Sequence, residues 1–240
     1  MTSQIKSHYE GVFTNLDKVD RVVVLTERQA GEMRQRFENV PLKVIPHYAR
    51  HASAAMPKQK FSGQVVYVAR YAPEKNHAAA IRAFALAVRR FPDLVFHCYG
   101  GGDPEKLRLS EISREAGVED AVRFHDFKEN VLEIYEQADL AILTSREEGF
   151  SLVVQEALSQ GVPVVSFDIR YGPGDMIQDG YNGFLVPEGD EAALAGRVCE
   201  VFSNPTLHKT LSENAIRSIN NRFSRAKVAP LWSSLLLGEG

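Results

Sequence analysis

From residue 61 onward, short apolar runs alternate with helical segments, and this alternation constrains the fold more than any other feature of the chain. Six apolar runs have the length of buried strands: Gln64–Ala69, Leu94–Tyr99, Ala121–Phe124, Leu140–Leu143, Val162–Phe167 and Gly183–Val186. The helical segments lie near residues 75–90, 104–116, 130–137, 151–160 and 190–203. Such alternation is typical of right-handed βαβ units. The sequence therefore predicts an α/β fold with a doubly wound, Rossmann-like parallel sheet.

The first part of the chain predicts a smaller arrangement of helix, strand, helix and strand. The apolar residues from Ile5 to Leu16 follow helical spacing, and Arg21–Leu25 and Leu42–Ile45 are short apolar strands. Between these strands, Thr26 can cap a helix while Gln29 reaches back toward its start, as in a capping box. This region therefore predicts a short unit of its own ahead of the regular part of the chain.

Four divisions of the chain follow from these patterns. Residues 1–50 form the first unit, and residues 51–60 lack periodicity and resemble a linker. We expect the Rossmann-like domain at 61–222 and a separate helix at 223–240. In that last helix, an apolar stripe follows the spacing of an amphipathic helix: Val228, Leu231, Trp232, Leu235 and Leu236. This stripe predicts packing onto the core, or alternatively attachment to a membrane surface.

The composition excludes several classes of function. The formal net charge of −3 gives no general attraction to nucleic acid. Cys98 and Cys199 provide no disulfide framework, and the seven histidines have no metal-binding spacing. No run approaches about 18 apolar residues, and the first ten residues lack an apolar signal segment. We therefore expect a cytoplasmic protein with no metal and no cofactor, in contact with the inner face of the membrane only if the last helix attaches there.

Polar residues gather where the predicted strands end, at the edge where α/β proteins bind ligands. Arg70 and Lys75 follow the first strand of the regular region. Arginine as a fork and lysine as a point charge can together hold a diphosphate. The alternative is an ordinary pair of surface cations.

Two acids eight positions apart provide the main functional signal. Glu148 precedes a predicted helix and Glu156 lies two turns inside it, roughly 12 Å away along the axis. Carboxylates so placed cannot share one small ion, but they can hold opposite ends of an elongated ligand rich in hydroxyl groups. Between them, Gly149, Phe150, Ser151 and Leu152 bring free N–H groups to the helix start, which attracts anions. Alternatively, Glu148 complements the helix dipole and Glu156 is exposed.

Two further loops are candidates for the same edge. Gly100 to Asp103, with Gly101 at its centre, follows a strand where a phosphate loop can lie, but Glu105 breaks the dinucleotide-binding pattern. A plain tight turn explains this loop equally well. His125 ends another strand and can line the cleft, whereas His97 alternates within its strand and is expected to be structural.

These motifs resemble those of a known family. The stretches VVYVARYAPEKN, VFHCYGGGDPEKL, LTSREEGFSLVVQEALSQGVPVVSFD and DGYNGFLVP resemble the C-terminal, nucleotide-sugar-binding domain of retaining group 1 glycosyltransferases with the GT-B fold. The resemblance runs from about Val65 to Phe223, and its signature is the glutamate pair with seven residues between. FDIRYGPGDMIQDGYNGFLV further resembles the branch that glycosylates teichoic acid or serine-rich surface proteins.

The resemblance implies roles for individual residues. Arg70 and Lys75 would bind the diphosphate of a UDP-sugar, Glu156 the ribose, and Glu148 the transferred hexose. The backbone of residues 149–152 would face the sugar and phosphate, and Phe127 would lie near the uracil. The family commonly has glycine where this chain has Asp126, so the geometry of the base site is expected to differ.

The resemblance also implies that most of the N-terminal half of a GT-B enzyme is missing. Residues 1–46 match only the end of that half, so the acceptor site and any catalytic groups from that half would be absent. The chain would then be a truncated enzyme, or one that a partner polypeptide completes. We expect a hexosyltransferase that retains the anomeric configuration and acts on a sugar, polymer or protein acceptor. The alternatives are a donor-binding subunit that is inactive alone and, ranked lower, a UDP-sugar epimerase.

Overall fold

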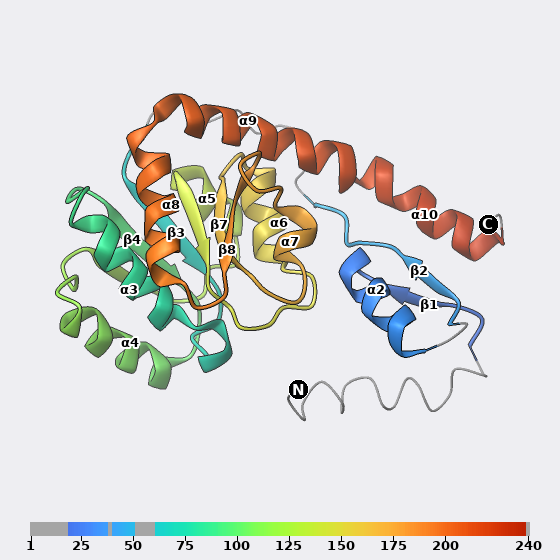
Figure 1. Ribbon diagram of the computed structural model, residues 1–240, viewed down its shortest axis with the longest axis horizontal. Coiled ribbons are helices and arrows are strands. Elements are labelled where there is room, and N and C mark those ends of the chain that lie inside the picture. The colour runs from blue at the N-terminus through green and yellow to red at the C-terminus, as the bar shows by residue number, and fades with distance from the viewer. Residues whose placement is uncertain (1–18, 38–39, 51–60, 239–240) are drawn as a thin grey trace.

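The computed structural model describes residues 19–37, 40–50 and 61–238. Its larger unit is built on a six-stranded parallel sheet with the order β5-β4-β3-β6-β7-β8 (Figure 1). The strands of this sheet are β3 (Gln64–Val68), β4 (Val95–Tyr99), β5 (Val122–His125), β6 (Leu140–Leu143), β7 (Val164–Asp168) and β8 (Gly183–Pro187). All six runs predicted as strands are therefore strands, with ends that differ by one or two residues.

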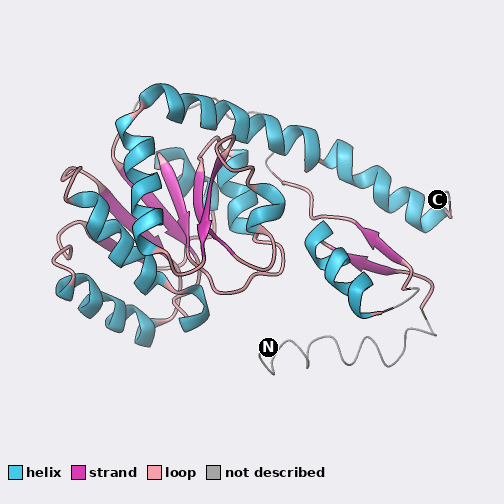
Figure 2. Cartoon of the chain, in the orientation of Figure 1, coloured by secondary structure: helices cyan, strands magenta, loops and turns pink. Residues whose placement is uncertain are grey.

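Helices cover the sheet on both sides (Figure 2). On one side α3 contacts both α4 and α8, and on the other α5 and α9 contact α6. The helices of this unit are η2 (Pro73–Lys75, a 3₁₀ turn), α3 (His77–Val88), α4 (Asp103–Glu115), α5 (Val131–Gln137), α6 (Leu152–Ser159), α7 (Pro173–Met176), α8 (Glu191–Ser203) and α9 (Pro205–Arg222). The doubly wound prediction is confirmed. Both α7 and the long helix α9 are additions that the apolar pattern did not predict.

The order of the strands determines where a ligand can bind. The chain moves outward from β3 to β4 and β5, then returns to place β6 on the other side of β3. β3 and β6 are therefore neighbours whose following loops diverge, and such a switch point opens a crevice beyond the carboxyl ends of the strands. All four residues of β6 are buried, as expected for a central parallel strand covered on both faces.

The first unit is a small βαβ arrangement with its own apolar cluster. β1 (Val22–Val24) and β2 (Leu42–Val44) pair in parallel, and α2 (Glu27–Arg36) packs on them. The hydroxyl of Thr26 accepts the Gln29 N–H at 3.1 Å, so the predicted cap is confirmed. The helix predicted between residues 5 and 16 and the linker at 51–60 lie outside the described residues.

The C-terminal helix α10 (Arg225–Leu237) forms where it was predicted. It continues from α9 and runs past the sheet toward the side where the first unit lies (Figure 1). Packing of its whole apolar stripe onto the core is wrong for the described part of the chain. Val228 is buried, but Trp232 is 41% exposed and Leu236 is 77% exposed. Attachment of this helix to a membrane surface stays a prediction, and no helix among the described residues is long and apolar enough to cross a membrane.

Candidate functional site

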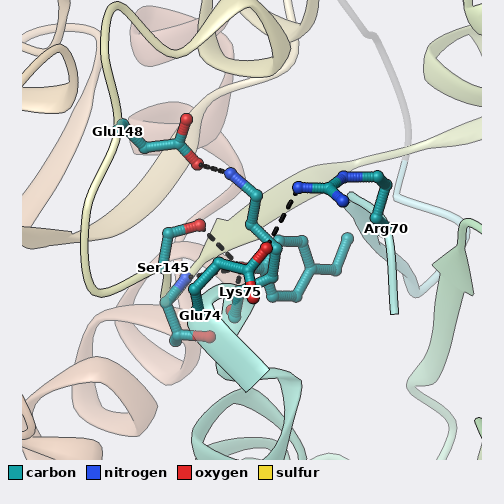
Figure 3. A network of polar contacts seen from close by, with 7 residues as sticks. Arg70, Glu74, Lys75, Ser145 and Glu148 are labelled. Carbon is teal, nitrogen blue, oxygen red and sulfur yellow. Dashed lines mark hydrogen bonds and ion pairs between the residues drawn. The ribbon is translucent and has the colours of Figure 1, made fainter. Parts of the chain in front are cut away.

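An ion pair connects the two loops that diverge at the switch point. Lys75, at the end of η2 after β3, places its Nζ 2.7 Å from Oε1 of Glu148 in the turn between β6 and α6 (Figure 3). Only 18% of the lysine side chain and 12% of the glutamate side chain are exposed. The structure thus brings together two of the predicted site residues in a largely buried pair, which screening by solvent weakens less than a surface pair.

Hydrogen bonds hold both loops below this ion pair. The Tyr67 hydroxyl donates to the Lys75 carbonyl at 2.5 Å and lies 3.2 Å from the Ser145 hydroxyl. The Thr144 hydroxyl donates to the Asn76 carbonyl at 2.8 Å. Burial raises the pKa of Tyr67 well above its ordinary value, so its hydroxyl keeps its proton. The end of β3, the start of α3 and the end of β6 are thereby joined into one polar network.

Arg70 lies at the rim, apart from the buried pair. Its Nη2 donates to Oε1 of Glu74 at 3.0 Å, and 74% of its side chain is exposed. Figure 3 shows the arginine on the opposite side of Lys75 from Glu148. The long, exposed side chain can move, whereas the backbone of Glu74 accepts the Arg146 N–H at 2.9 Å and is held in place.

The start of α6 has an unusual backbone and an orphaned polar atom. Ser151, the N-cap residue, has a left-handed backbone with φ of 68°. Its Oγ is buried and has no hydrogen-bond partner among the described residues. Leu152 follows at 50% exposure. The first N–H groups of a helix have few partners within the helix, so a helix start of this kind can face an anion.

The neighbouring residues of the turn have different surroundings. Phe150 is buried, and its ring meets those of His47 and Phe223. Gly149 is exposed, and an added Cβ there would meet no atom within 4 Å. The glycine at this position is therefore not required by crowding within the chain.

Glu156 lies farther along α6 in a partly buried position. Burial raises the pKa of its carboxyl above the ordinary value, and the charge of Arg50 opposes that shift. Burial, with a smaller contribution from the charge of Glu156, raises the pKa of Tyr135, whose hydroxyl donates to the Val153 carbonyl at 3.0 Å. The exposed position considered as an alternative for Glu156 is thus wrong.

The loops that follow β4 and β5 carry the remaining predicted residues, which are more exposed than Lys75 and Glu148. Phe127 is 76% exposed after β5, and Gly101 is exposed after β4 with open space around it. The crowded glycines of that loop are its neighbours, since a Cβ at Gly100 would lie 2.0 Å from the Ala69 carbonyl oxygen and one at Gly102 2.4 Å from that of Tyr71. This loop packs closely against the chain just after β3, with Gly101 exposed.

His97 and His125 lie on β4 and β5, whereas His77 lies at the start of α3. His97 is half-buried, and its ring hydrogen-bonds His125 at 2.9 Å and Gln64 at 2.7 Å. The pKa values of both histidines are lowered, mainly by burial. His77, which the sequence did not single out, stacks on Tyr67 and is buried with neither ring nitrogen partnered among the described residues. Burial lowers its pKa to about 4.

The first unit also contacts the turn through Gln29. The Gln29 amide donates to the carbonyl of Gly149 at 2.8 Å, and its oxygen accepts the N–H of Leu25 at 3.0 Å. In the predicted capping box, the Gln29 side chain would accept the N–H of the cap residue Thr26. It accepts the N–H of Leu25 instead, one residue earlier in the chain. The TERQ pattern in the sequence indicated a helix start, but it gave no sign of the contact from Gln29 to Gly149.

Across the described ranges, no group of three or more His, Cys, Asp or Glu side chains is placed to hold a metal ion.

Comparisons with known proteins identify the family of this chain. Residues 52–218 match the family described as glycosyl transferases group 1. The poly(glycerol-phosphate) alpha-glucosyltransferase of Bacillus subtilis is 29% identical over 238 residues, which cover 97% of this chain and 35% of that protein. The poly(ribitol-phosphate) alpha-N-acetylglucosaminyltransferase of Staphylococcus aureus is 26% identical, over 98% of this chain and 47% of that protein. The chain thus spans less than half the length of these relatives.

Solved structures give the same result. S. aureus TarM, in a crystal structure of its G117R mutant with fondaparinux, alpha-GlcNAc-glycerol and UDP, superimposes with a TM-score of 0.88 and 26% identity over 96% of this chain and 46% of that one. The pneumococcal O-GlcNAc transferase GtfA, in complex with UDP and GlcNAc, gives 0.83 and 26% over 97% and 47%. These neighbours are GT-B glycosyltransferases. The chain therefore belongs to the group 1 glycosyltransferases.

Proposed function

We propose that this chain binds the UDP-sugar donor of a hexosyltransferase that retains the anomeric configuration. The observation that carries the proposal is the junction at the switch point of the sheet. There the largely buried pair of Lys75 and Glu148 joins the end of η2 to the turn that leads into α6. The start of α6 holds the buried hydroxyl of Ser151, which has no hydrogen-bond partner among the described residues. Solved relatives that contain UDP support the choice of nucleotide.

The charges of the junction suit a diphosphate that gains charge as it leaves. Lys75 and the N-terminus of α6 would face the phosphates, and Ser151 would use its free hydroxyl on them. Arg70 would swing from Glu74 to the outer phosphate oxygens. Lys75 and the helix start, which are already in place, would lower the energy of the transition state because they need little reorganisation as charge develops. Lys75 would have a charge partner both in the free protein, where it pairs with Glu148, and in the donor complex, where it would pair with the phosphates.

The two acids would bind different parts of the donor. Glu148 would contact the hexose beside the bond that breaks, and Glu156, deeper along α6, would accept hydrogen bonds from the ribose. The backbone of residues 149–152 would line the phosphate and sugar. Gly101 would allow close approach beyond β4, and Phe127 would pack on the base.

Calorimetric titration with UDP and with several UDP- and GDP-sugars tests this assignment. We expect UDP and at least one UDP-sugar to bind, and Glu156→Ala to weaken UDP binding more than Glu148→Ala does. Glu148→Ala should instead remove the extra affinity that the sugar provides. A reversed order with UDP alone would show that the two acids are wrongly assigned, and absence of UDP binding would refute the proposal.

A second reading follows from the length of the chain relative to its relatives. A chain that covers 35% to 47% of those proteins can be the donor-binding part of an assembly in which a partner supplies the acceptor side. A solved neighbour is described as the GtfA/B complex. This reading predicts UDP binding without hydrolysis or transfer of the sugar, whereas the enzyme reading predicts turnover of the donor by the chain itself. Release of UDP from the preferred UDP-sugar distinguishes them.

A further inference from the structure

The amide of Gln29 has its orientation determined by two neighbours. The N–H of Leu25 requires an acceptor and meets Oε1 at 3.0 Å, so the amide nitrogen must face the other way. There it donates to the Gly149 carbonyl at 2.8 Å. Gln29 is only 8% exposed, so solvent competes little for either contact. Helix α2 thus holds, through one side chain, a peptide 120 residues away in the sequence.

A second route joins α2 to the same turn. The Glu148 N–H donates to the Arg170 carbonyl at 3.2 Å, and the Tyr171 N–H donates to the Glu148 carbonyl at 2.8 Å. The Tyr171 hydroxyl in turn donates to the carboxylate of Glu32, on the next turn of α2. The backbone of Glu148 is therefore held through the Arg170–Tyr171 segment, which α2 itself contacts.

A third set of contacts aligns the helix. The Arg28 guanidinium lies 2.5 Å from Oδ1 of Asp168, and its backbone N–H donates to Asp175 at 3.3 Å. Both side chains of the ion pair are about two-fifths exposed, so the pair contributes little net stability. Its effect is on the position of α2 along the turn, because it places Gln29 beside Gly149.

The Gly149 carbonyl is where such a restraint matters. Glycine has more backbone freedom than any other residue, and nothing crowds Gly149 on its Cβ side. In a trans peptide the carbonyl and the following N–H point in opposite directions. Holding the carbonyl of Gly149 toward α2 therefore turns the N–H of Phe150 away from α2. The same restraint limits the backbone just before the left-handed Ser151.

We propose that Gln29 is a positioning residue that presets the turn of Glu148 to Ser151 for the donor, so that donor affinity depends on the docking of α2. The inference rests on the proposed donor site. Because coupling between two sites is reciprocal, donor binding should also strengthen the docking of α2. Gln29 acts through Gly149 and does not itself touch the donor.

Three variants separate positioning from stability. Gln29→Met removes both amide contacts. Gln29→Glu keeps an acceptor for Leu25 but loses the donor to Gly149. Asn214→Leu is the matched control, because Asn214 is also 8% exposed and its amide also donates to a loop carbonyl, that of Tyr181 at 3.0 Å. The readouts are hydrogen exchange of the amides in residues 147–153 and the Kd for UDP.

In both Gln29 variants we expect faster exchange in residues 147–153 and a Kd for UDP raised roughly threefold to tenfold, the effect of one neutral hydrogen bond. Asn214→Leu should lower the melting temperature comparably while leaving both readouts near wild type. As pH falls from 8 to 5, the Kd of Gln29→Glu should approach that of the wild type at the same pH, because a protonated carboxyl can again donate to Gly149.

Other results overturn the inference. Unchanged exchange in residues 147–153 in both Gln29 variants would refute the restraint, and faster exchange with an unchanged Kd would refute its link to the donor. An equal effect of Asn214→Leu on the Kd would reduce Gln29 to a structural role. If the wild type binds no UDP, the proposed function fails, and the exchange measurement alone still decides whether Gln29 restrains the turn.

Discussion

The loops on the two sides of β3 present their side chains in different ways. On the inner side, toward β6, Lys75 and Glu148 are more than four-fifths buried and rest on the network of Tyr67. On the outer side, beyond β4 and β5, Phe127 is 76% exposed and Asp126 makes an ion pair with Lys106 while 86% exposed. A ligand that bridges both sides would meet groups already in place at one end and must order side chains at the other, at a cost in entropy. The inner side should therefore provide most of the affinity, and the outer side the choice of base.

The largest effect should come from Lys75 on the inner side. Lys75→Ala removes a fixed cation and leaves Glu148 partly buried without its partner. We expect a loss of UDP affinity on the order of 100-fold, consistent with 2–5 kcal/mol for one partner of a buried charge pair. Lys209→Ala, at an exposed lysine of α9, is the control and should bind UDP like the wild type. Equal affinity of Lys75→Ala and wild type in calorimetry would eliminate the inner side as the source of binding energy.

The pH dependence of stability should also originate on the inner side. His77 is buried against Tyr67 with a pKa lowered to about 4 by burial, with smaller effects from Glu105 and Lys75. In the unfolded chain its pKa is near 6.5, so the unfolded state binds the proton first as pH falls. Stability is full above about pH 6.5 and is lost toward pH 4, by on the order of 3 kcal/mol. Urea unfolding of the wild type and His77→Phe at several pH values measures this, and equal slopes for the two proteins would contradict it.

A smaller effect should follow from loosening the network below the ion pair. Tyr67→Phe removes the hydroxyl that contacts the Lys75 carbonyl and Ser145, leaving buried polar groups unpaired. We expect a free energy of unfolding lower by about 1–3 kcal/mol and a weaker UDP affinity. Tyr135→Phe, which removes a buried hydroxyl bonded to the Val153 carbonyl, should cost similar stability with less effect on UDP. If the two variants bind UDP equally, the network does not preset Lys75.

The smallest effect should come from the outer side. Phe127→Ala removes a ring that packs on little, so the melting temperature should stay within about 1–2 °C of the wild type. Binding of UDP should weaken only severalfold, with a larger change in the preference for UDP over GDP. Leu236→Ala, at 77% exposure on α10, is the control for an exposed apolar side chain. A loss as large as that of Lys75→Ala would reverse the comparison between the two sides.

The sheet was predictable from the sequence, whereas helix α9 was not. The strands of parallel sheets are apolar throughout, and this signal does not depend on partners. Helix α9 was not recognised because its buried face includes polar side chains, among them His208, Ser212, Asn214 and Ser218. These groups interrupt the apolar stripe, and their contacts arise only in the folded chain, as when the Asn182 amide donates to Ser218 at 2.9 Å.

The proximity of Lys75 and Glu148 was predictable from the sequence, but the contacts of the candidate site residues were not. Loops that follow neighbouring parallel strands must meet at one edge, so Lys75 and Glu148 could be placed near each other. Their pairing with each other, the turn of Arg70 toward Glu74, and the burial of Glu156 depend on side-chain rotamers and tertiary packing. The contact from Gln29 to Gly149 joins separate units, and no local pattern carries such information.

The exposed face of α10 has a practical consequence. Trp232 is the sole tryptophan of the chain and lies on that face, 41% accessible to water. Its fluorescence therefore reports on one helix alone, without any label. A blue shift or protection from quenching on addition of a lipid vesicle, of a second polypeptide or of more of the same chain would identify what shields α10, and a titration would give the affinity directly.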